Sequence, residues 1–142
     1  MASNRSTYIS NLVTLLSGIS GAASAFAGQE WPELEQHAST ELPMLWVKTP
    51  DQSVVTHPEL YRLDDAVLVR IYRLDWDTKA TFASAEAWIE KIVEKVETDP
   101  TLGGTVVFSE YVSSRAILRD FPLCVEEVAF KMVHHSTGFT NI

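Results

Sequence analysis

The 142-residue sequence predicts an α+β fold: a mostly antiparallel sheet of about four to five strands, with two main helices packed on one face. Three observations lead to this prediction. Two stretches carry apolar residues at helical spacing, several shorter stretches are β-branched or alternate in polarity, and helices and strands do not alternate regularly. An order of helix, about three strands, helix and two strands is typical of a sheet that helices cover on one side.

Composition bounds the class of protein. The chain has 46% hydrophobic and 21% charged residues, typical of a globular protein, and its length fits one domain over residues 1–142. A net charge of −8 without a cluster of Lys and Arg argues against a nucleic-acid-binding surface, because basic side chains must replace phosphate counterions there. The one cysteine, Cys124, stands among apolar residues and has no disulfide partner, which suits a reducing compartment.

The first helix is expected from a cap at Ser3 or Asn4 to about Ser17, before Gly18 and Gly21 end it. Its apolar face is formed by residues three and four apart: Ile9, Leu12, Val13, Leu16 and Ile19.

A secretory signal over residues 1–25 is the alternative for this region. Arg5 and the small residues Ala23-Ser24-Ala25 resemble the two ends of such a signal, but polar residues interrupt its apolar core. We therefore favour an amphipathic helix of the mature protein. No apolar run reaches the roughly 20 residues that a membrane span requires, so no membrane partner is expected.

Three strands are expected before the second helix. They are residues 22–28, Leu42–Val47 with Pro43 near its start, and Ala66–Leu74, where Val67, Val69 and Ile71 share one face. Two polar connections separate them. The first is Glu30–Thr40, with a helical turn expected at Trp31-Pro32-Glu33, and the second is the long connection of residues 49–64, which is rich in turn formers.

The second helix is expected from Thr81 to about Thr98 and leads into a structural junction. Asp99 precedes Pro100, which keeps Asp99 out of the helical region and ends the helix. Asp99 then caps one new turn that has Pro100 in its first position, and Gly103 closes this turn with a positive φ. Gly104 releases the chain into a β-branched run. The junction residues are Asp99, Pro100, Gly103 and Gly104.

The remaining chain predicts two strands and a free end. Thr105–Val112 is expected as a strand, Ser113–Pro122 as a connection, and Leu123–His134 as a strand with clean alternation at its end. Residues 136–142 lack periodicity and are expected to be a flexible C-terminal end.

No pattern of residues predicts catalysis, a cofactor or a metal. The adjacent His134 and His135 point to opposite faces of a strand and are poor ligands for one ion. Asp75-Trp76-Asp77 supplies too few ligands for a divalent cation and is expected as a strand end and helix cap. Glu126 and Glu127, also adjacent, are expected to be one solvated and one interface charge.

The order of elements resembles that of the tail terminator proteins of long-tailed bacteriophages. Two segments carry the resemblance as motifs, namely Leu42-Pro43-Met44-Leu45-Trp46-Val47 and Asp99-Pro100-Thr101-Leu102-Gly103-Gly104-Thr105-Val106. Elsewhere the resemblance is one of architecture: an N-terminal helix, a long strand like Val67–Leu74, a second helix and a final pair of strands. Other head–tail joining proteins and tail tube proteins share this topology.

This resemblance implies a structural virion protein without enzymatic activity. Its members form a ring, usually a hexamer, that caps the tail tube at the head–tail junction after assembly in the host cytoplasm. The implied partners are further copies of the chain, a tail tube protein and a head-completion or connector protein. Genomic DNA passes through the ring without specific binding.

Two sets of residues follow as candidates for these roles. Aromatic residues in the expected connections, which are Trp31, Tyr61 and Trp76, fit interface anchors. Carboxylates that would keep the channel acidic or neutral are Asp75, Asp77, Glu126 and Glu127. The alternatives are another joining or tube protein of the same topology, and a small cytoplasmic α+β enzyme or ligand-binding domain.

Overall fold

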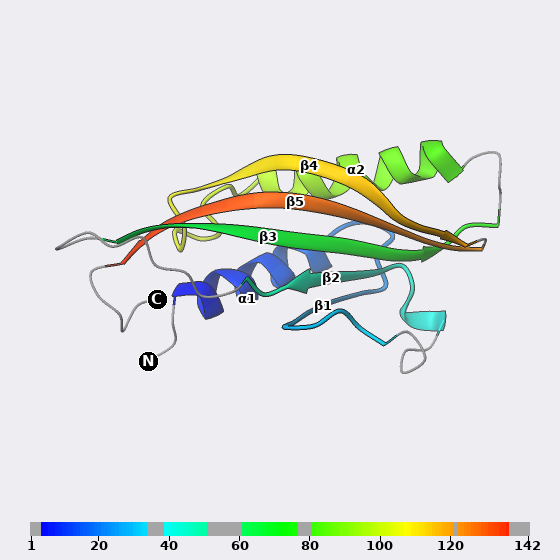
Figure 1. Ribbon diagram of the computed structural model, residues 1–142, viewed down its shortest axis with the longest axis horizontal. Coiled ribbons are helices and arrows are strands. Elements are labelled where there is room, and N and C mark those ends of the chain that lie inside the picture. The colour runs from blue at the N-terminus through cyan, green and yellow to red at the C-terminus, as the bar shows by residue number, and fades with distance from the viewer. Residues whose placement is uncertain (1–3, 34–38, 51–60, 77–80, 121, 137–142) are drawn as a thin grey trace.

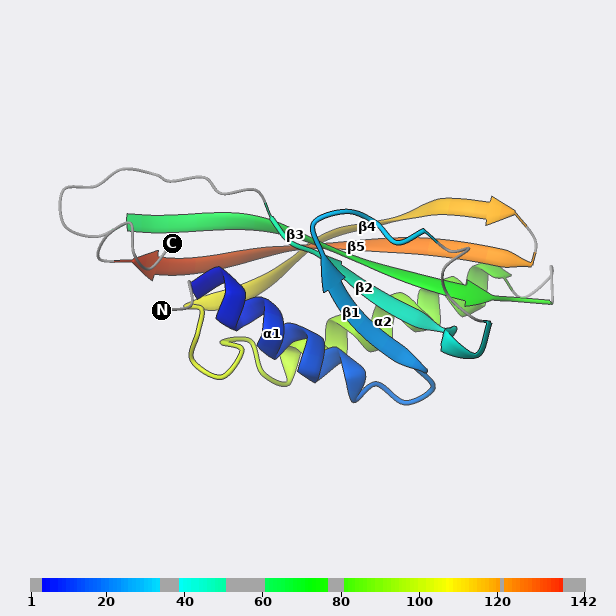
Figure 2. The ribbon, with the colours of Figure 1, turned by 90° about the horizontal axis from the view of Figure 1, so that it is seen from below.

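The computed structural model describes residues 4–33, 39–50, 61–76, 81–120 and 122–136. Helices α1 (Asn4–Ser17) and α2 (Thr81–Glu97) lie on one side of a five-stranded sheet, as Figures 1 and 2 show. The strands are β1 (Ser24–Gly28), β2 (Met44–Lys48), β3 (Tyr61–Leu74), β4 (Phe108–Asp120) and β5 (Leu123–Ser136), and a short 3₁₀ helix, η2 (Ser39–Glu41), precedes β2. The predicted α+β class is confirmed.

The strands follow the spatial order β1-β2-β3-β5-β4. The pair β1–β2 is parallel and the other three pairs are antiparallel. Strands β1 and β4 therefore form the two edges of the sheet, and among the described residues each pairs with one neighbour only.

The core lies between the sheet and the two helices. Val67, Val69 and Ile71 of β3 point into it and are fully buried, which confirms the alternation predicted for this strand. Leu12 of α1 and Ile92 of α2 contribute to the same core. We call this side of the sheet the helix-covered face. The opposite side, on which no described helix packs, is called the helix-free face.

The predicted ends of β4 were wrong. Strand β4 begins at Phe108 rather than Thr105 and continues to Asp120 through the segment expected as a connection. Its register against β5 shifts between Tyr111 and Ser113 and again between Ala116 and Leu118. Each shift changes which residues share a face, so the alternation that marks a strand in sequence is lost.

Strand β3 is longer than predicted. It begins at Tyr61 rather than Ala66, and residues 61–64 pair with the end of β5 instead of belonging to the connection. Asp64 and Asp65 are poor strand formers, but their side chains have ion-pair partners in the folded chain. Residues 51–60 of the expected connection and 137–142 of the expected flexible end lie outside the described residues.

The junction after α2 follows the predicted pattern in its main features. Helix α2 ends at Glu97, the Asp99 Oδ1 atom accepts a hydrogen bond from the Gly103 N–H at 3.2 Å, and Gly103 has the predicted positive φ of 72°. Leu102 also has a positive φ, of 48°, which the sequence did not indicate. Its side chain is fully buried, and its carbonyl accepts a hydrogen bond from the Asn11 amide at 2.9 Å, so packing against α1 holds this conformation. By contrast, the helical turn expected at 31–33 is absent there.

Candidate interaction surface

A row of five side chains crosses the helix-free face, one from each strand. The register places Phe26 opposite Trp46, Trp46 opposite Arg70, Arg70 opposite Glu127, and Glu127 opposite Arg115. Because side chains on paired strands that lie directly opposite each other share a face, the five form one line from edge β1 to edge β4. We call this line the transverse row.

The row is aromatic at the β1 edge and charged at the β4 edge. The rings of Phe26 and Trp46 have centroids 5.9 Å apart. Glu127 accepts hydrogen bonds from Arg70 Nε at 2.8 Å and from Arg115 Nε at 3.1 Å. One carboxylate thus serves two guanidinium groups, so the row carries a net positive charge, and the Arg115 side chain at the edge is 66% exposed.

Of the aromatic residues expected as interface anchors, Trp31 lies against this row. The Arg70 guanidinium is 3.8 Å from the centroid of the Trp31 ring, and Lys48 Nζ is 5.6 Å from it. This stacking holds Trp31 against β2 and β3 of its own subunit. Trp76 follows β3 and is 71% exposed, whereas the side chain of Tyr61 lies outside what the structure describes. Their interface role stays a prediction.

The two edges of the sheet differ in the side chains around them. Near β4 several large apolar side chains are exposed, and Val112 is the most exposed of them at 59%; the others are Val107, Phe108, Tyr111 and Leu118. Strand β1 holds no charged residue. In α1 next to it, the side chains that are described as exposed all carry hydroxyl groups: Ser6, Thr7, Ser10, Thr14 and Ser17. Exposed apolar and uncharged surfaces of this kind are typical of protein–protein contacts.

Three of the acids expected to face the channel, Asp75, Glu126 and Glu127, form ion pairs within the subunit, and their place in a channel stays a prediction. Arg73 donates hydrogen bonds to both carboxylate oxygens of Glu126, at 3.0 and 2.7 Å, and to Asp75 at 2.9 Å. Although burial alone disfavours the charged guanidinium, these hydrogen bonds raise the pKa of Arg73. Glu126 is fully buried on the helix-covered face, and Glu127 is almost fully buried in the transverse row.

This burial corrects the expectation that one of Glu126 and Glu127 is solvated. Neither Glu126 nor Glu127 is a solvated charge, because arginines from neighbouring strands cover and neutralise both. Asp75 is likewise paired with Arg73, so within the subunit none of these three presents a free carboxylate. Asp77 lies outside the described residues.

A second buried ion-pair cluster, which was not among the predictions from the sequence, joins α1 to β3 and β5. The Asp65 carboxylate accepts hydrogen bonds from Arg5 Nε at 2.8 Å, Arg5 Nη2 at 2.9 Å and the Tyr8 hydroxyl at 2.6 Å. His134 Nε2 lies 2.9 Å from the same carboxylate, and all four residues are buried. We call these residues the Asp65 cluster.

Hydrogen bonding outweighs burial at Asp65. Burial by itself raises the pKa of a carboxyl group, but the hydrogen bonds from His134, Arg5 and Tyr8 lower the pKa of Asp65 to about 2. Burial and the neighbouring carboxylate raise the pKa of Tyr8, which therefore stays protonated as a donor. One signal in the sequence points to this cluster: Arg5 lies on the apolar face of α1, three residues before Tyr8, where a charge needs a buried partner.

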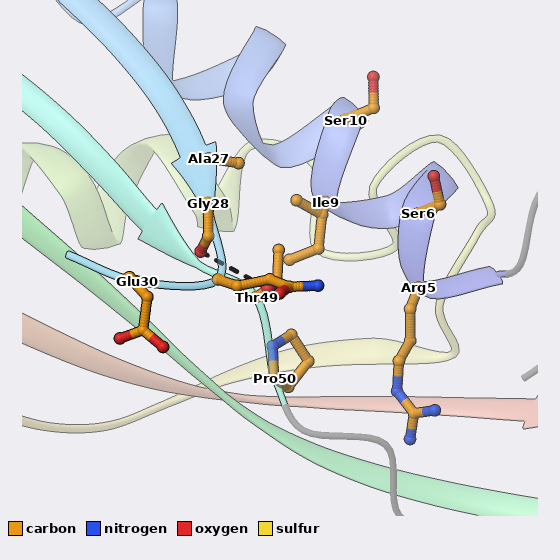
Figure 3. Close-up of a pocket in the computed structure, with 10 residues that line it drawn as sticks. Arg5, Ser6, Ile9, Ser10, Ala27, Gly28, Glu30, Thr49 and Pro50 are labelled. Atoms are coloured by element: carbon orange, nitrogen blue, oxygen red, sulfur yellow. Dashed lines mark hydrogen bonds between the residues drawn. The ribbon is translucent and has the colours of Figure 1, made fainter. Parts of the chain in front are cut away.

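An open pocket of about 660 Å³ lies between the start of α1 and the ends of β1 and β2 (Figure 3). Its walls come from α1, from the residues that end and follow β1, and from Thr49-Pro50, and the Thr49 N–H donates to the Gly28 carbonyl at 2.9 Å. Among the described residues that line it, the titratable ones are Arg5, whose guanidinium already binds Asp65, and Glu30. These two groups do not form an acid–base pair of the kind that catalysis needs.

Within the described ranges, no group of three or more His, Cys, Asp or Glu side chains is placed to hold a metal ion. Neither α1 nor α2 is long and apolar enough to cross a membrane.

Comparisons with known proteins find a likeness in structure but none in sequence. No family model and no curated protein matches the sequence. Among solved structures, a chain of the "Virion of native gene transfer agent (GTA) particle" is similar, with a TM-score of 0.49 and 7% sequence identity. The alignment covers 93% of this chain and 94% of that one.

Proposed function

We propose that the chain is a structural protein of a phage-like virion and forms one subunit of a closed ring at the head–tail junction. The observation that carries this proposal is the pair of unlike edges of the sheet, β1 and β4, each unpaired on its outer side among the described residues. An unpaired edge is a template for another strand and is normally protected in a protein that works as a monomer.

Unlike edges favour a ring over a two-fold dimer. A contact between β4 of one copy and a different surface of the next is heterologous, and heterologous contacts close into rings when the rotation between copies permits it. The sequence resemblance to tail terminator proteins supports a ring of six copies. Its further partners in this proposal are the tail tube protein on one side and a head-completion or connector protein on the other.

The charges of the helix-free face suit a channel through which DNA passes. Basic and acidic side chains pair on this face, as Arg70 does with Glu127 and Lys131 with Asp64, at 2.8 and 3.6 Å. A lining of paired charges neither binds phosphates strongly, as unpaired basic residues do, nor repels them strongly. We propose this lining, in which carboxylates offset all but a small surplus of basic charge in the transverse row, in place of the free carboxylates of Asp75, Glu126 and Glu127, with Asp77 retained as a candidate.

Native mass measurement followed by electron microscopy of the purified chain, alone and with tail tube protein, tests the proposal. A closed ring that caps tubes at a fixed end is the expected result. A chain that polymerises into tubes by itself is instead a tube protein. If the chain remains a monomer both alone and with the tube protein, or if it binds DNA in a salt-sensitive way, the proposal is wrong.

A further inference from the structure

We infer that neighbouring copies in the ring join their sheets through residues 113–116 of β4 and strand β1 of the next copy. This inference rests on the proposed ring and specifies which surfaces make it. The occupant of the β4 edge is a second copy of this chain, and the two strands pair with Arg115 opposite the Phe26 of the next copy.

The directions of the strands permit this contact. Strand β1 is parallel to β2, and each step from β2 through β3 and β5 to β4 reverses direction, so β4 runs antiparallel to β1. A second copy placed edge to edge in the same orientation therefore continues the sheet with an antiparallel pair. Antiparallel pairs have straight hydrogen bonds and need no crossover connection.

The bulges of β4 select the segment that can pair. Register shifts on either side of Ser113–Ala116 bend the strand and prevent pairing along its full length. The regular stretch between them matches the short β1, which spans Ser24–Gly28. The two segments also lie at the same level, because Arg115 and Phe26 are the two ends of the transverse row. In a closed ring, successive copies are not displaced along the ring axis. If the strands run nearly parallel to that axis, segments at the same level in the subunit therefore meet at the interface.

The faces of the sheet also agree in this register. Arg115 and Phe26 both lie on the helix-free face, and Ser114 and Ala27 both lie on the helix-covered face. With Arg115 opposite Phe26 of the next copy, Ser114 lies opposite Ala27, so the helices of all copies stay on the same side of the joined sheet.

The chemistry of the two edges supports the contact. Strand β1, with the sequence Ser-Ala-Phe-Ala-Gly, has neither a charge nor a proline, the two devices that usually protect an edge strand. The exposed guanidinium of Arg115 would extend over the ring of Phe26 in the next copy, which repeats across the interface the stacking of Arg70 on Trp31. Uncharged hydroxyl residues of α1 flank β1 and add no charge that must be desolvated.

Disulfide trapping tests the register. We would introduce Ser114→Cys together with Ala27→Cys and oxidise the assembled protein mildly, because directly opposed residues of an antiparallel pair lie within disulfide distance. The natural Cys124 is buried and its pKa is raised by that burial, so it stays out of the reaction. The expected product is a ladder of linked copies up to the ring size on a non-reducing gel.

The matched control is Ser114→Cys with Ala25→Cys, which uses the same edges and the same face but shifts the register by two residues. We expect this pair to link at least about tenfold less, since diagonal neighbours are about 7–8 Å apart. Equal linking by both pairs, or a wild-type ring in which Ser114→Cys and Ala27→Cys do not link, overturns the inference while leaving the proposed ring intact. Absence of any ring in wild-type protein overturns both.

A second variant tests the same contact without introduced cysteines, so that the result does not depend on whether the cysteine variants fold. Ala27 is exposed in the subunit, so Ala27→Lys places a charge on the β1 edge without disturbing the core. The expected result is ring assembly weakened about tenfold or more, with an unchanged circular dichroism spectrum and melting temperature of the monomer. Rings that form normally from Ala27→Lys protein contradict the inference.

Discussion

The Asp65 cluster and the charged end of the transverse row use the same type of ion pair in opposite settings. In the Asp65 cluster one carboxylate receives all its hydrogen bonds inside the core and joins α1 to β3 and β5. In the row, Glu127 is also buried, but its partner Arg115 is two-thirds exposed at the edge of the sheet. The first arrangement holds the subunit together. The second leaves a charged group where a neighbour can reach it.

Removal of the Asp65 charge should have the largest effect. Asp65→Asn leaves the buried Arg5 guanidinium without its counter-charge, so we expect the free energy of unfolding to fall by about 3–5 kcal/mol. Urea denaturation measures it. The neighbouring Asp64→Asn is the matched control, because Asp64 and its partner Lys131 are both partly exposed and such pairs contribute less than about 1 kcal/mol. Equal losses from the two variants would contradict the comparison.

Acid should weaken the Asp65 cluster by a smaller amount. The pKa of Asp65 is lowered from 3.8 to about 2 in the folded chain, so the folded state favours the charged carboxylate. This stabilisation is fully present above about pH 4 and is lost as the pH falls toward 2, and it amounts to about 2 kcal/mol. We expect the stability gap between wild type and Asp65→Asn to narrow by about that amount between pH 5 and pH 2 in urea titrations. A gap that stays constant would show that Asp65 does not titrate as described.

Loss of one hydrogen-bond donor from the Asp65 cluster should lower the free energy of unfolding by a still smaller amount. Tyr8→Phe removes the hydroxyl that donates to Asp65 at 2.6 Å but keeps the ring packed on His134 and leaves the carboxylate its other donors. Hydrogen bonds to charged groups contribute about 1.5–3 kcal/mol, and the remaining donors compensate in part, so we expect a loss of about 1–2 kcal/mol. Thermal and urea unfolding measure it. No loss at all would mean that the hydroxyl is redundant.

Neither the Asp65 cluster nor the charged end of the transverse row was predicted from the sequence, and the reasons differ. Features set by neighbouring residues were predictable. The core positions of β3 follow from the alternation of polar and apolar residues, and the turn at Gly103 follows from the residues around it. The Asp65 cluster joins residues 57 to 69 positions apart, and no local pattern fixes which distant groups meet. Only the position of Arg5 on an apolar helix face indicated that a buried partner exists.

The charged end of the transverse row could not be predicted from the sequence for a different reason. Its charged end depends on β4, where two bulges break the alternation and the polar residues Ser113, Ser114 and Arg115 resemble a loop. Glu126 and Glu127 on β5 were therefore expected to be one solvated and one interface charge, although arginines from neighbouring strands pair with both and both are buried. An edge strand tolerates polar residues because one side of it is exposed, so composition alone is a weak guide to such strands.

Arg115→Ala should have the smallest effect on the subunit and thereby separates stability from assembly. Glu127 keeps its hydrogen bond to Arg70 in this variant, and the lost partner is mostly exposed, so we expect the free energy of unfolding of the monomer to change by less than about 1 kcal/mol. If Arg115 contacts the next copy, the same variant weakens ring formation, and native mass spectra over a dilution series would show a lower ring fraction at each concentration.

Arg70→Ala is the informative contrast, because it removes both the Trp31 stacking and the other Glu127 pair inside the subunit. It should lower subunit stability more than Arg115→Ala does. A variant Arg115→Ala that destabilises the monomer as much as Arg70→Ala would place Arg115 among the groups that hold the subunit together, and the contrast between the two clusters would fail.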